Sequence, residues 1–397
     1  GAGSDTFNVD AGSDKITDLS ASDILVVSSG ATAAATISAN YTATNVTKND
    51  GTVNLTIGAG GLTTDLNLAS GGAGFNIIGS AGTDTIVATG KSDTFTIASS
   101  GQGNLDVLDG GAGADTLTDT SAQANGNGNS FIGRDGNDTI TGGAGKDTVD
   151  GGNGNDSITT GAGNDTVSPG AGNDIVIAGD GNDTVLAAAG NDSLSGGAGN
   201  DTFTMGTNLT TSDTIDGGEG TDTMDIDARA AMVAGTVTGV ESITARFDTD
   251  PDTFNAAGIS GLSTLSLNST NDTTRVDVTN LASGVTVSNV DTDVDNLVID
   301  TVAGADITFN NGSGTMATGI TVADAATVTV TNTSASASDI VALVLDAVDT
   351  TRLDVDGGTG ANLDTGAITG TNKLATVDLT TSTSGRTLTL GTIADAD

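Results

Sequence analysis

The sequence contains no cysteine, histidine or tryptophan, and only 2 prolines among 397 residues. Without cysteine there is no disulfide framework, no thiol nucleophile and no cysteine-based zinc or iron–sulfur site. Without histidine there is no Ser-His-Asp triad, no histidine general base and no HExxH metalloprotease helix. No nucleophile–base pair can be assigned from the remaining residue types. We therefore expect that this chain is not an enzyme.

Positive charge is also scarce: 11 Lys and Arg stand against 51 Asp and Glu, which gives a net charge of −40. Such a chain repels nucleic acid phosphates and anionic lipid surfaces, so cations are the expected partners and nucleic acid is not. No apolar run is long enough to span a membrane. Aromatic residues make up 2% of the chain, which favours a thin layered core over a thick globular one.

A nine-residue period dominates the middle of the chain, and a short repeat of this kind decides the fold. Residues 133–204 divide without a gap into eight nonapeptides: GRDGNDTIT, GGAGKDTVD, GGNGNDSIT, TGAGNDTVS, PGAGNDIVI, AGDGNDTVL, AAAGNDSLS and GGAGNDTFT. Position four is always Gly, position six is always Asp, and position eight is always apolar. The glycines permit positive φ and close approach of neighbouring coils. The three-residue strand at positions seven to nine points its one apolar side chain inward.

This pattern resembles the RTX family, whose nonapeptide is G-G-x-G-x-D-x-U-x, with U a large apolar residue. The resemblance implies an all-β, calcium-loaded parallel β-roll, in which six residues turn around Ca²⁺ and three form a strand. It implies calcium ligation at position six of the regular repeats and, in looser copies, at aspartates with the same nine-residue phase. These candidate ligands are Asp138, Asp147, Asp156, Asp165, Asp174, Asp183, Asp192, Asp201, Asp84, Asp93, Asp106, Asp115, Asp213, Asp222, Asp5 and Asp14.

Local chemistry agrees with this assignment, because a carboxylate beside the carbonyls of a glycine turn suits the hard cation Ca²⁺. The alternative is turn preference alone, since Asn, Asp and Gly dominate turns. It explains single aspartates better than eight in one phase. In a β-roll each ion lies between repeats n and n+2, so eight repeats predict six internal sites. Stacked carboxylates repel one another, so we expect the block to be disordered without metal and to fold on binding calcium. The least certain turn is at residues 187–189, where alanine replaces both opening glycines.

The composition predicts six segments. They are degenerate RTX-like repeats at 1–28, a β-rich insertion at 29–70, degenerate repeats at 71–118, a loop at 119–132, the regular β-roll at 133–225, and a Thr/Ala/Val-rich β region at 226–397. In the last segment short alternating strands recur about every ten residues, which is typical of a β-solenoid or β-sandwich. Both ends of the chain interrupt a pattern, as expected of a segment of a longer protein.

RTX repeats followed by a long Thr/Ala/Val-rich β region are similar to surface-layer (S-layer) proteins of Gram-negative bacteria. This resemblance implies type I secretion, an extracellular place at the cell surface, and assembly with copies of itself into a lattice. Cell-surface polysaccharide is a further candidate partner. Two alternatives remain open: an RTX adhesin or extracellular matrix filament, and the calcium-folded secretion module of a larger exported enzyme or toxin.

Overall fold

A computed structural model describes most of the chain as β-strands and turns. The described residues are 3–20, 23–80, 82–97, 105–120, 127–187, 189–228, 231–233, 235–247, 252–269, 276–288, 296–311, 319–332, 338–339, 342–346, 352–356, 363–364, 367–369, 376–380, 388–389 and 393–394. None of them is helical, and among them there is no helix long and apolar enough to cross a membrane. The chain divides into two compact units, Gly1–Thr202 and Phe203–Asp397. This division falls inside the predicted segment 133–225.

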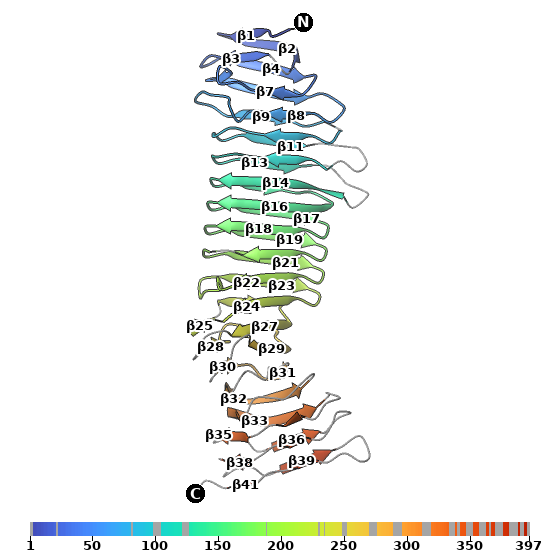
Figure 1. The fold of residues 1–397 in the computed structure, drawn as a ribbon, viewed down its shortest axis with the longest axis vertical. Coiled ribbons are helices and arrows are strands. Elements are labelled where there is room, and N and C mark those ends of the chain that lie inside the picture. Colours follow the sequence, from blue (N-terminus) through green and yellow to red (C-terminus); the bar gives the residue numbers. More distant parts are fainter. Residues whose placement is uncertain are drawn as a thin grey trace. The chain divides into compact units, whose positions relative to one another are not determined.

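The first unit is a parallel β-solenoid with two main sheets, which Figure 1 shows as stacked coils. Sheet 1 contains β2 (Ser13–Leu19), β4 (Thr32–Ile37), β7 (Thr52–Ile57), β9 (Phe75–Ile78), β11 (Thr94–Ile97), β13 (Thr116–Asp119), β15 (Thr139–Thr141), β17 (Ser157–Ala162), β19 (Ile175–Asp180) and β21 (Ser193–Ala198). Sheet 2 contains β5 (Tyr41–Thr42), β8 (Thr63–Asp65), β10 (Thr85–Val87), β12 (Val107–Asp109), β14 (Asn127–Asp135), β16 (Lys146–Asn153), β18 (Thr166–Ala171) and β20 (Thr184–Ala187). A small third sheet joins β1 (Thr6–Val9), β3 (Ile24–Val27) and β6 (Lys48–Asn49).

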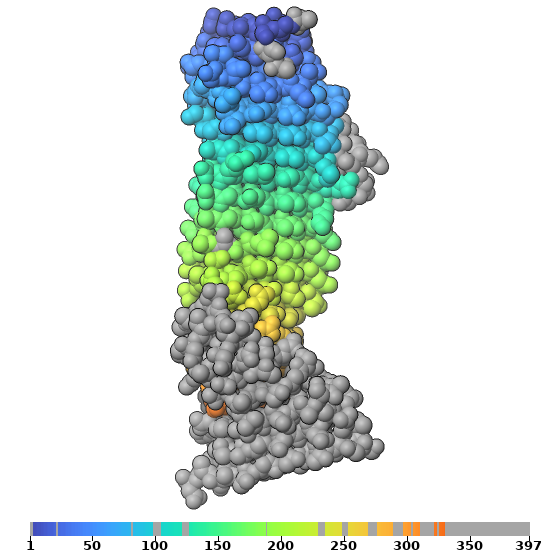
Figure 2. Space-filling view, viewed as in Figure 1, coloured from blue at the N-terminus to red at the C-terminus, as the bar shows by residue number. Residues whose placement is uncertain are grey.

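Strand register follows the repeat. Thr139 of β15 pairs with Ser157 of β17, and Thr148 of β16 pairs with Thr166 of β18, so each coil uses two nonapeptides. Each strand buries its position-eight residue: Ile140 and Ile158 from sheet 1 and Val149 and Val167 from sheet 2 are at most 1% exposed. The core is therefore one thin layer between two sheets, as the shortage of aromatics predicts. In Figure 2 the coils of this unit form successive colour bands from blue to green.

Two segment predictions differ from the structure. Residues 29–70 are not an insertion, because β4 pairs with β2 and β7 pairs with β9 in sheet 1. The loop prediction for 119–132 is wrong over 127–132, since these residues belong to β14, which pairs with β12 and β16. In both places the coils exceed 18 residues: Thr116 pairs with Thr139, and Asn54 pairs with Asn76. Extra residues in the turns hide the period without breaking the ladder.

The alanine-rich repeat has a local effect. The pairing of β18 with β20 shifts register between Val167 and Gly170, and Gly170 lies opposite Ala187. Ala188 lies outside the described residues. The shift coincides with the repeat in which alanine replaces both opening glycines.

The second unit continues with parallel pairing only, so its described strands form a β-solenoid; a sandwich is built from antiparallel sheets. Its strands are β22 (Thr202–Gly206), β23 (Thr214–Glu219), β24 (Thr223–Asp227), β25 (Ala231–Val233), β26 (Thr236–Thr238), β27 (Ser242–Phe247), β28 (Asp252–Asn255), β29 (Thr264–Ser269), β30 (Val276–Leu281), β31 (Val285–Ser288), β32 (Asn296–Asn311), β33 (Gly319–Asn332), β34 (Ser338–Asp339), β35 (Ala342–Asp346), β36 (Arg352–Asp356), β37 (Leu363–Asp364), β38 (Ala367–Thr369), β39 (Thr376–Thr380), β40 (Leu388–Thr389) and β41 (Ile393–Ala394).

The position-four glycines allow the closest approach between coils. Gly154 has φ of +137°, and a Cβ atom there would lie 1.5 Å from the carbonyl oxygen of Gly136. We predict that Gly154→Ala lowers the free energy of unfolding in calcium by at least about 2 kcal/mol, because it combines backbone strain with overlap. Gly90→Ala is the matched control, since a Cβ there meets nothing within 4 Å. Urea unfolding measures both, and equal stability of the two variants would contradict this packing.

Candidate metal centre

The turns between the sheets line up the aspartates of position six in two columns. Each carboxylate accepts a hydrogen bond, at Oδ1, from the backbone N–H of the equivalent residue one coil earlier. The N–H of Asp138 donates to Asp156 at 2.8 Å, and the N–H of Asp147 donates to Asp165 at 2.7 Å. The first ladder is Asp84, Asp106, Asn129, Asp147, Asp165, Asp183 and Asp201. The second ladder is Asp93, Asp115, Asp138, Asp156, Asp174 and Asp192.

The second carboxylate oxygen of most ladder aspartates is buried and receives no hydrogen bond from any described residue. This holds for Oδ2 of Asp106, Asp115, Asp138, Asp147, Asp156, Asp165, Asp174 and Asp183. Each of these side chains is at most 2% exposed. An ionised oxygen buried without a partner is costly, so this row requires protons or cations.

Position-one glycines form the other wall of the sites at Asp115, Asp138, Asp147 and Asp156, whereas Thr160, Pro169 and Ala178 take this position before Asp165, Asp174 and Asp183. A Cβ on Gly133 would lie 2.4 Å from Oδ2 of Asp138 and 2.3 Å from the carbonyl oxygen of Gly151. A Cβ on Gly142 would likewise lie 2.4 Å from Oδ2 of Asp147. The missing side chain thus leaves a small space lined by a carboxylate oxygen and a carbonyl oxygen of the next coil. All-oxygen donor sets of this kind fit Ca²⁺.

The charges stand in rows, not in clusters. Among the described residues, no group of three or more acidic side chains is arranged to hold one metal ion. Any ion would therefore take one or two carboxylates and complete its shell with turn carbonyls, which Ca²⁺ accepts readily. Calcium, once bound, supplies the positive charge that the row lacks.

Four aspartates in the same phase satisfy Oδ2 from within their own turn. The Thr89 N–H and hydroxyl both donate to Oδ2 of Asp93, and the Ser80 N–H donates to Oδ2 of Asp84 at 2.7 Å. The N–H and hydroxyl of Ser20 both donate to Oδ2 of Asp23, and the N–H of Thr210 donates to Oδ2 of Asp213. In these turns a Ser or Thr donates the hydrogen bond that Oδ2 would otherwise lack. We therefore expect the strongest metal sites at the eight aspartates whose Oδ2 receives no such bond.

The remaining predicted ligands lie elsewhere. Asp5 is half-buried, and its N–H donates to Asp23 at 3.0 Å. Asp14 is exposed within β2 and does not join either ladder. In the second unit the N–H of Asp222 donates to Glu241 at 2.8 Å, and a Cβ on Gly217 would lie 2.6 Å from Oδ2 of Asp222. Asp222 thus has the surroundings of a ladder aspartate.

Three ladder residues escaped the sequence reasoning. Asn129 stands in the first ladder, where its N–H donates to Asp147 and its side-chain amide donates to buried Asp119 at 2.7 Å. Asp119 lies at repeat position one. In this turn position six is therefore an amide, Asn129, and the carboxylate is at position one. Glu241 takes the ladder place after Asp222. A search allowing coils of 19 to 23 residues would have found Asn129 and Glu241.

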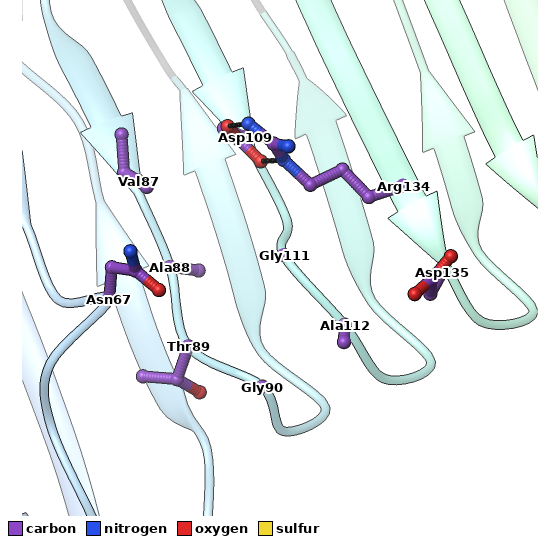
Figure 3. A pocket seen from close by; sticks show the side chains of 10 residues that line it. All are labelled: Asn67, Val87, Ala88, Thr89, Gly90, Asp109, Gly111, Ala112, Arg134 and Asp135. Carbon is purple, nitrogen blue, oxygen red and sulfur yellow. Dashed lines mark hydrogen bonds and ion pairs between the residues drawn. The ribbon is translucent and has the colours of Figure 1, made fainter.

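A cavity of about 360 Å³ opens beside this irregular coil, and Figure 3 shows residues that line it. Arg134 occupies repeat position two with φ of +79°, the conformation that glycines adopt in the other repeats. Its guanidinium pairs with Asp109 of β12 through two hydrogen bonds. The titratable groups lining the cavity are Asp109, Arg134 and Asp135.

Burial changes the acidity of the ladders. Burial, reinforced by the charges of Asp165 and Asp119, raises the pKa of Asp147 to about 8. Burial also raises the pKa of Asp115 to about 8 and the pKa values of Asp106, Asp156 and Asp183 to about 6. The ladder without metal therefore holds protons that the unfolded chain releases near pH 4.

Comparison with known proteins agrees with the geometry, which defines a parallel β-roll whose turns carry calcium-type sites. The RTX calcium-binding nonapeptide repeat matches residues 1–31, 78–96, 100–118, 124–158, 132–167, 141–176, 168–203 and 210–227, together less than half of the chain. The chain thus carries multiple RTX repeats, a known calcium-binding motif. No curated protein and no solved structure matches it.

We predict that Asp165→Ala raises the calcium concentration at the folding midpoint by at least about tenfold, because two coils lose a shared carboxylate. Asp65→Ala is the control, since Asp65 lies in β8 outside both ladders. The measurement is circular dichroism of the full chain during a calcium titration. A midpoint that moves equally in both variants would argue against the ladder as the metal site.

The raised pKa values give a pH dependence of known sign. In chelator the native ladder binds more protons than the unfolded chain between about pH 4 and pH 8, so stability falls as pH rises across this window. Calcium competes with those protons, so its affinity should rise over the same window. Dichroism in chelator at pH 5 and pH 8, with calorimetric calcium titrations at both, checks this. Metal-free stability that grows toward pH 8 would contradict the buried ladders.

Proposed function

We propose that this chain is part of a structural protein of the cell surface, an S-layer subunit that folds on calcium and assembles with its own copies. The observation that carries the proposal is the row of eight buried carboxylates whose Oδ2 atoms receive no hydrogen bond from described residues. A chain of net charge −40 cannot close this row without counter-charge. Calcium therefore acts as the structural staple.

The requirement for calcium supports an extracellular place. Free calcium reaches the millimolar range outside cells, where weak modular sites are filled. Proteins with RTX repeats are typically secreted, and type I secretion fits a chain that folds only after export. The absence of cysteine fits an exported chain stabilised by metal in place of disulfides.

A structural role also suits what the coils offer. The chain lacks histidine and cysteine, and the carboxylate of Asp109 in the cavity is paired with Arg134. Two long solenoid units provide extended side surfaces, which serve contact between subunits better than chemistry on a small molecule. We therefore propose that the chain works without catalysis.

Electron microscopy of the purified protein with and without calcium tests this function. We expect a two-dimensional lattice in millimolar calcium and dispersed chains in chelator, because only the calcium form presents ordered surfaces. Isolated fibres would point to an adhesin or matrix filament. Uniform monomers in excess calcium would point to a secretion module and would overturn the S-layer proposal.

A further inference from the structure

Over nine successive strands of sheet 1 in the first unit, β4 to β21, the alternating outward positions that precede the turn lack charge on the outer face; the exposed Asp180 lies beyond them at the end of β19. We call the side chains at these outward positions the uncharged face. They are Thr32, Ala34, Thr36, Thr52, Asn54, Thr56, Asn76, Ile78, Thr94, Thr96, Thr116, Thr118, Thr139, Thr141, Ser157, Thr159, Ile175, Ile177, Ser193 and Ser195. Charged residues make up 16% of the chain, so about three of these twenty positions would be charged at the average rate.

Parallel pairing arranges these side chains in two straight columns. One column runs through Thr116, Thr139, Ser157, Ile175 and Ser193. The other runs beside it through Thr118, Thr141, Thr159, Ile177 and Ser195. Nearer the N-terminus, the side-chain amide of Asn76 donates to Asn54 at 2.9 Å. The face is thus one continuous surface of hydroxyl, amide and aliphatic groups.

The lack of charge is specific to this face. At the corresponding outward positions the outer surface of sheet 2 presents Asp65 and Asp150. On sheet 1 itself the uncharged face begins abruptly, because the preceding strand β2 exposes Asp14, Lys15 and Asp18.

The uncharged face also exposes large apolar side chains. Ile175 is 52% exposed, Ile177 is 48% exposed and Ile78 is 47% exposed. Exposure of these isoleucine side chains to water is unfavourable, and burying each of them against a partner would lower the free energy. Serine and threonine at the neighbouring positions can donate and accept hydrogen bonds, so the surface is self-complementary.

We propose that the uncharged face binds the uncharged face of a second copy of this chain, with the two sheets packed face to face. This proposal rests on the assembly named above and identifies the surface responsible. Two copies at −40 each repel one another over most orientations, and this face lets them touch without burying like charges. A two-fold axis satisfies both copies at once.

The size of the face sets the strength of the contact. Nine strands about 4.8 Å apart, with outward side chains spread over about 14 Å, give about 600 Å² per copy. Stable pairs bury about 800 Å² per partner, so one such contact is weak and reversible. Repetition in a lattice makes weak contacts cumulative.

The test introduces carboxylates on the uncharged face in one variant and on the outer surface of sheet 2 in another, and compares the self-association of the two variants. Thr141→Asp with Ile177→Asp places two charges on the uncharged face. Thr148→Asp with Leu186→Asp is the matched control, because it makes the same chemical change on the outer surface of sheet 2. Calcium-dependent dichroism first establishes that both variants fold. Sedimentation in millimolar calcium then measures self-association.

We expect the uncharged-face variant to raise the dissociation constant of the pair at least about tenfold, with the control close to the unaltered protein. Raising monovalent salt at fixed calcium should strengthen the wild-type pair, because it screens the repulsion between the remaining charges. Weakening by salt would indicate calcium bridges between carboxylates and would overturn the proposal. So would equal loss in both variants, or a wild-type chain that stays monomeric.

The outcomes separate this proposal from the proposed function. A lattice that forms normally from the uncharged-face variant would leave the S-layer function standing and remove this surface from it. A pair that forms through this face without a lattice would support the surface and overturn the S-layer function. Unchanged self-association of the variant together with lost attachment to cells would assign the face to a different partner, against the proposal.

Discussion

The fold depends on a buried carboxylate that hydrogen bonds only half satisfy. One oxygen of each ladder aspartate accepts an N–H from the coil before it, as in the pair of Asp138 and Asp156. This bond ties successive coils together, but it also brings like charges close in a dry turn. The raised pKa of Asp147 measures the cost of ionising that position without a cation. A counter-charge is therefore part of the fold, and we expect calcium binding and folding to be coupled.

Turns in the same phase meet the same demand in different ways. Asp93 and Asp84 receive hydroxyl and amide donors from Thr89 and Ser80, four residues earlier. Beside Asp138 and Asp147 no such donor reaches Oδ2, and the glycines five residues earlier, Gly133 and Gly142, leave room for an ion. Near Asn129 an amide replaces the carboxylate and Asp119 supplies the charge from the other end of the turn. The solenoid is thus continuous in backbone but divided in its dependence on metal. We therefore expect the turns at Asp84 and Asp93 to depend less on calcium than those of the regular block.

The structure of the regular repeats could be predicted from sequence because an exact nine-residue period leaves no alternative strand register. It sets the 18-residue register, the inward side chains and the ladder positions together. The ladder positions were harder to predict where a coil is longer than 18 residues. The added residues at 119–132 shift Asn129 out of the nine-residue period, although Asn129 still occupies its place in the ladder. The distinction between Asp93 and Asp138 was also out of reach. It depends on whether a Ser or Thr four residues earlier folds back onto Oδ2, which is a matter of turn geometry.

The repeat also separates charge from contact surface. Position six places every ladder aspartate in a turn, whereas positions seven and nine point outward from the strands. A strongly acidic chain can therefore carry its charge along the turns and keep one sheet face neutral. The two outer faces need not share this property: sheet 2 has Asp150 at position nine, where the sheet 1 strands β15 and β17 have Thr141 and Thr159. Periodicity alone gives both faces the same outward positions, and the choice of Thr, Ser and Ile at these positions keeps the sheet 1 face free of charge.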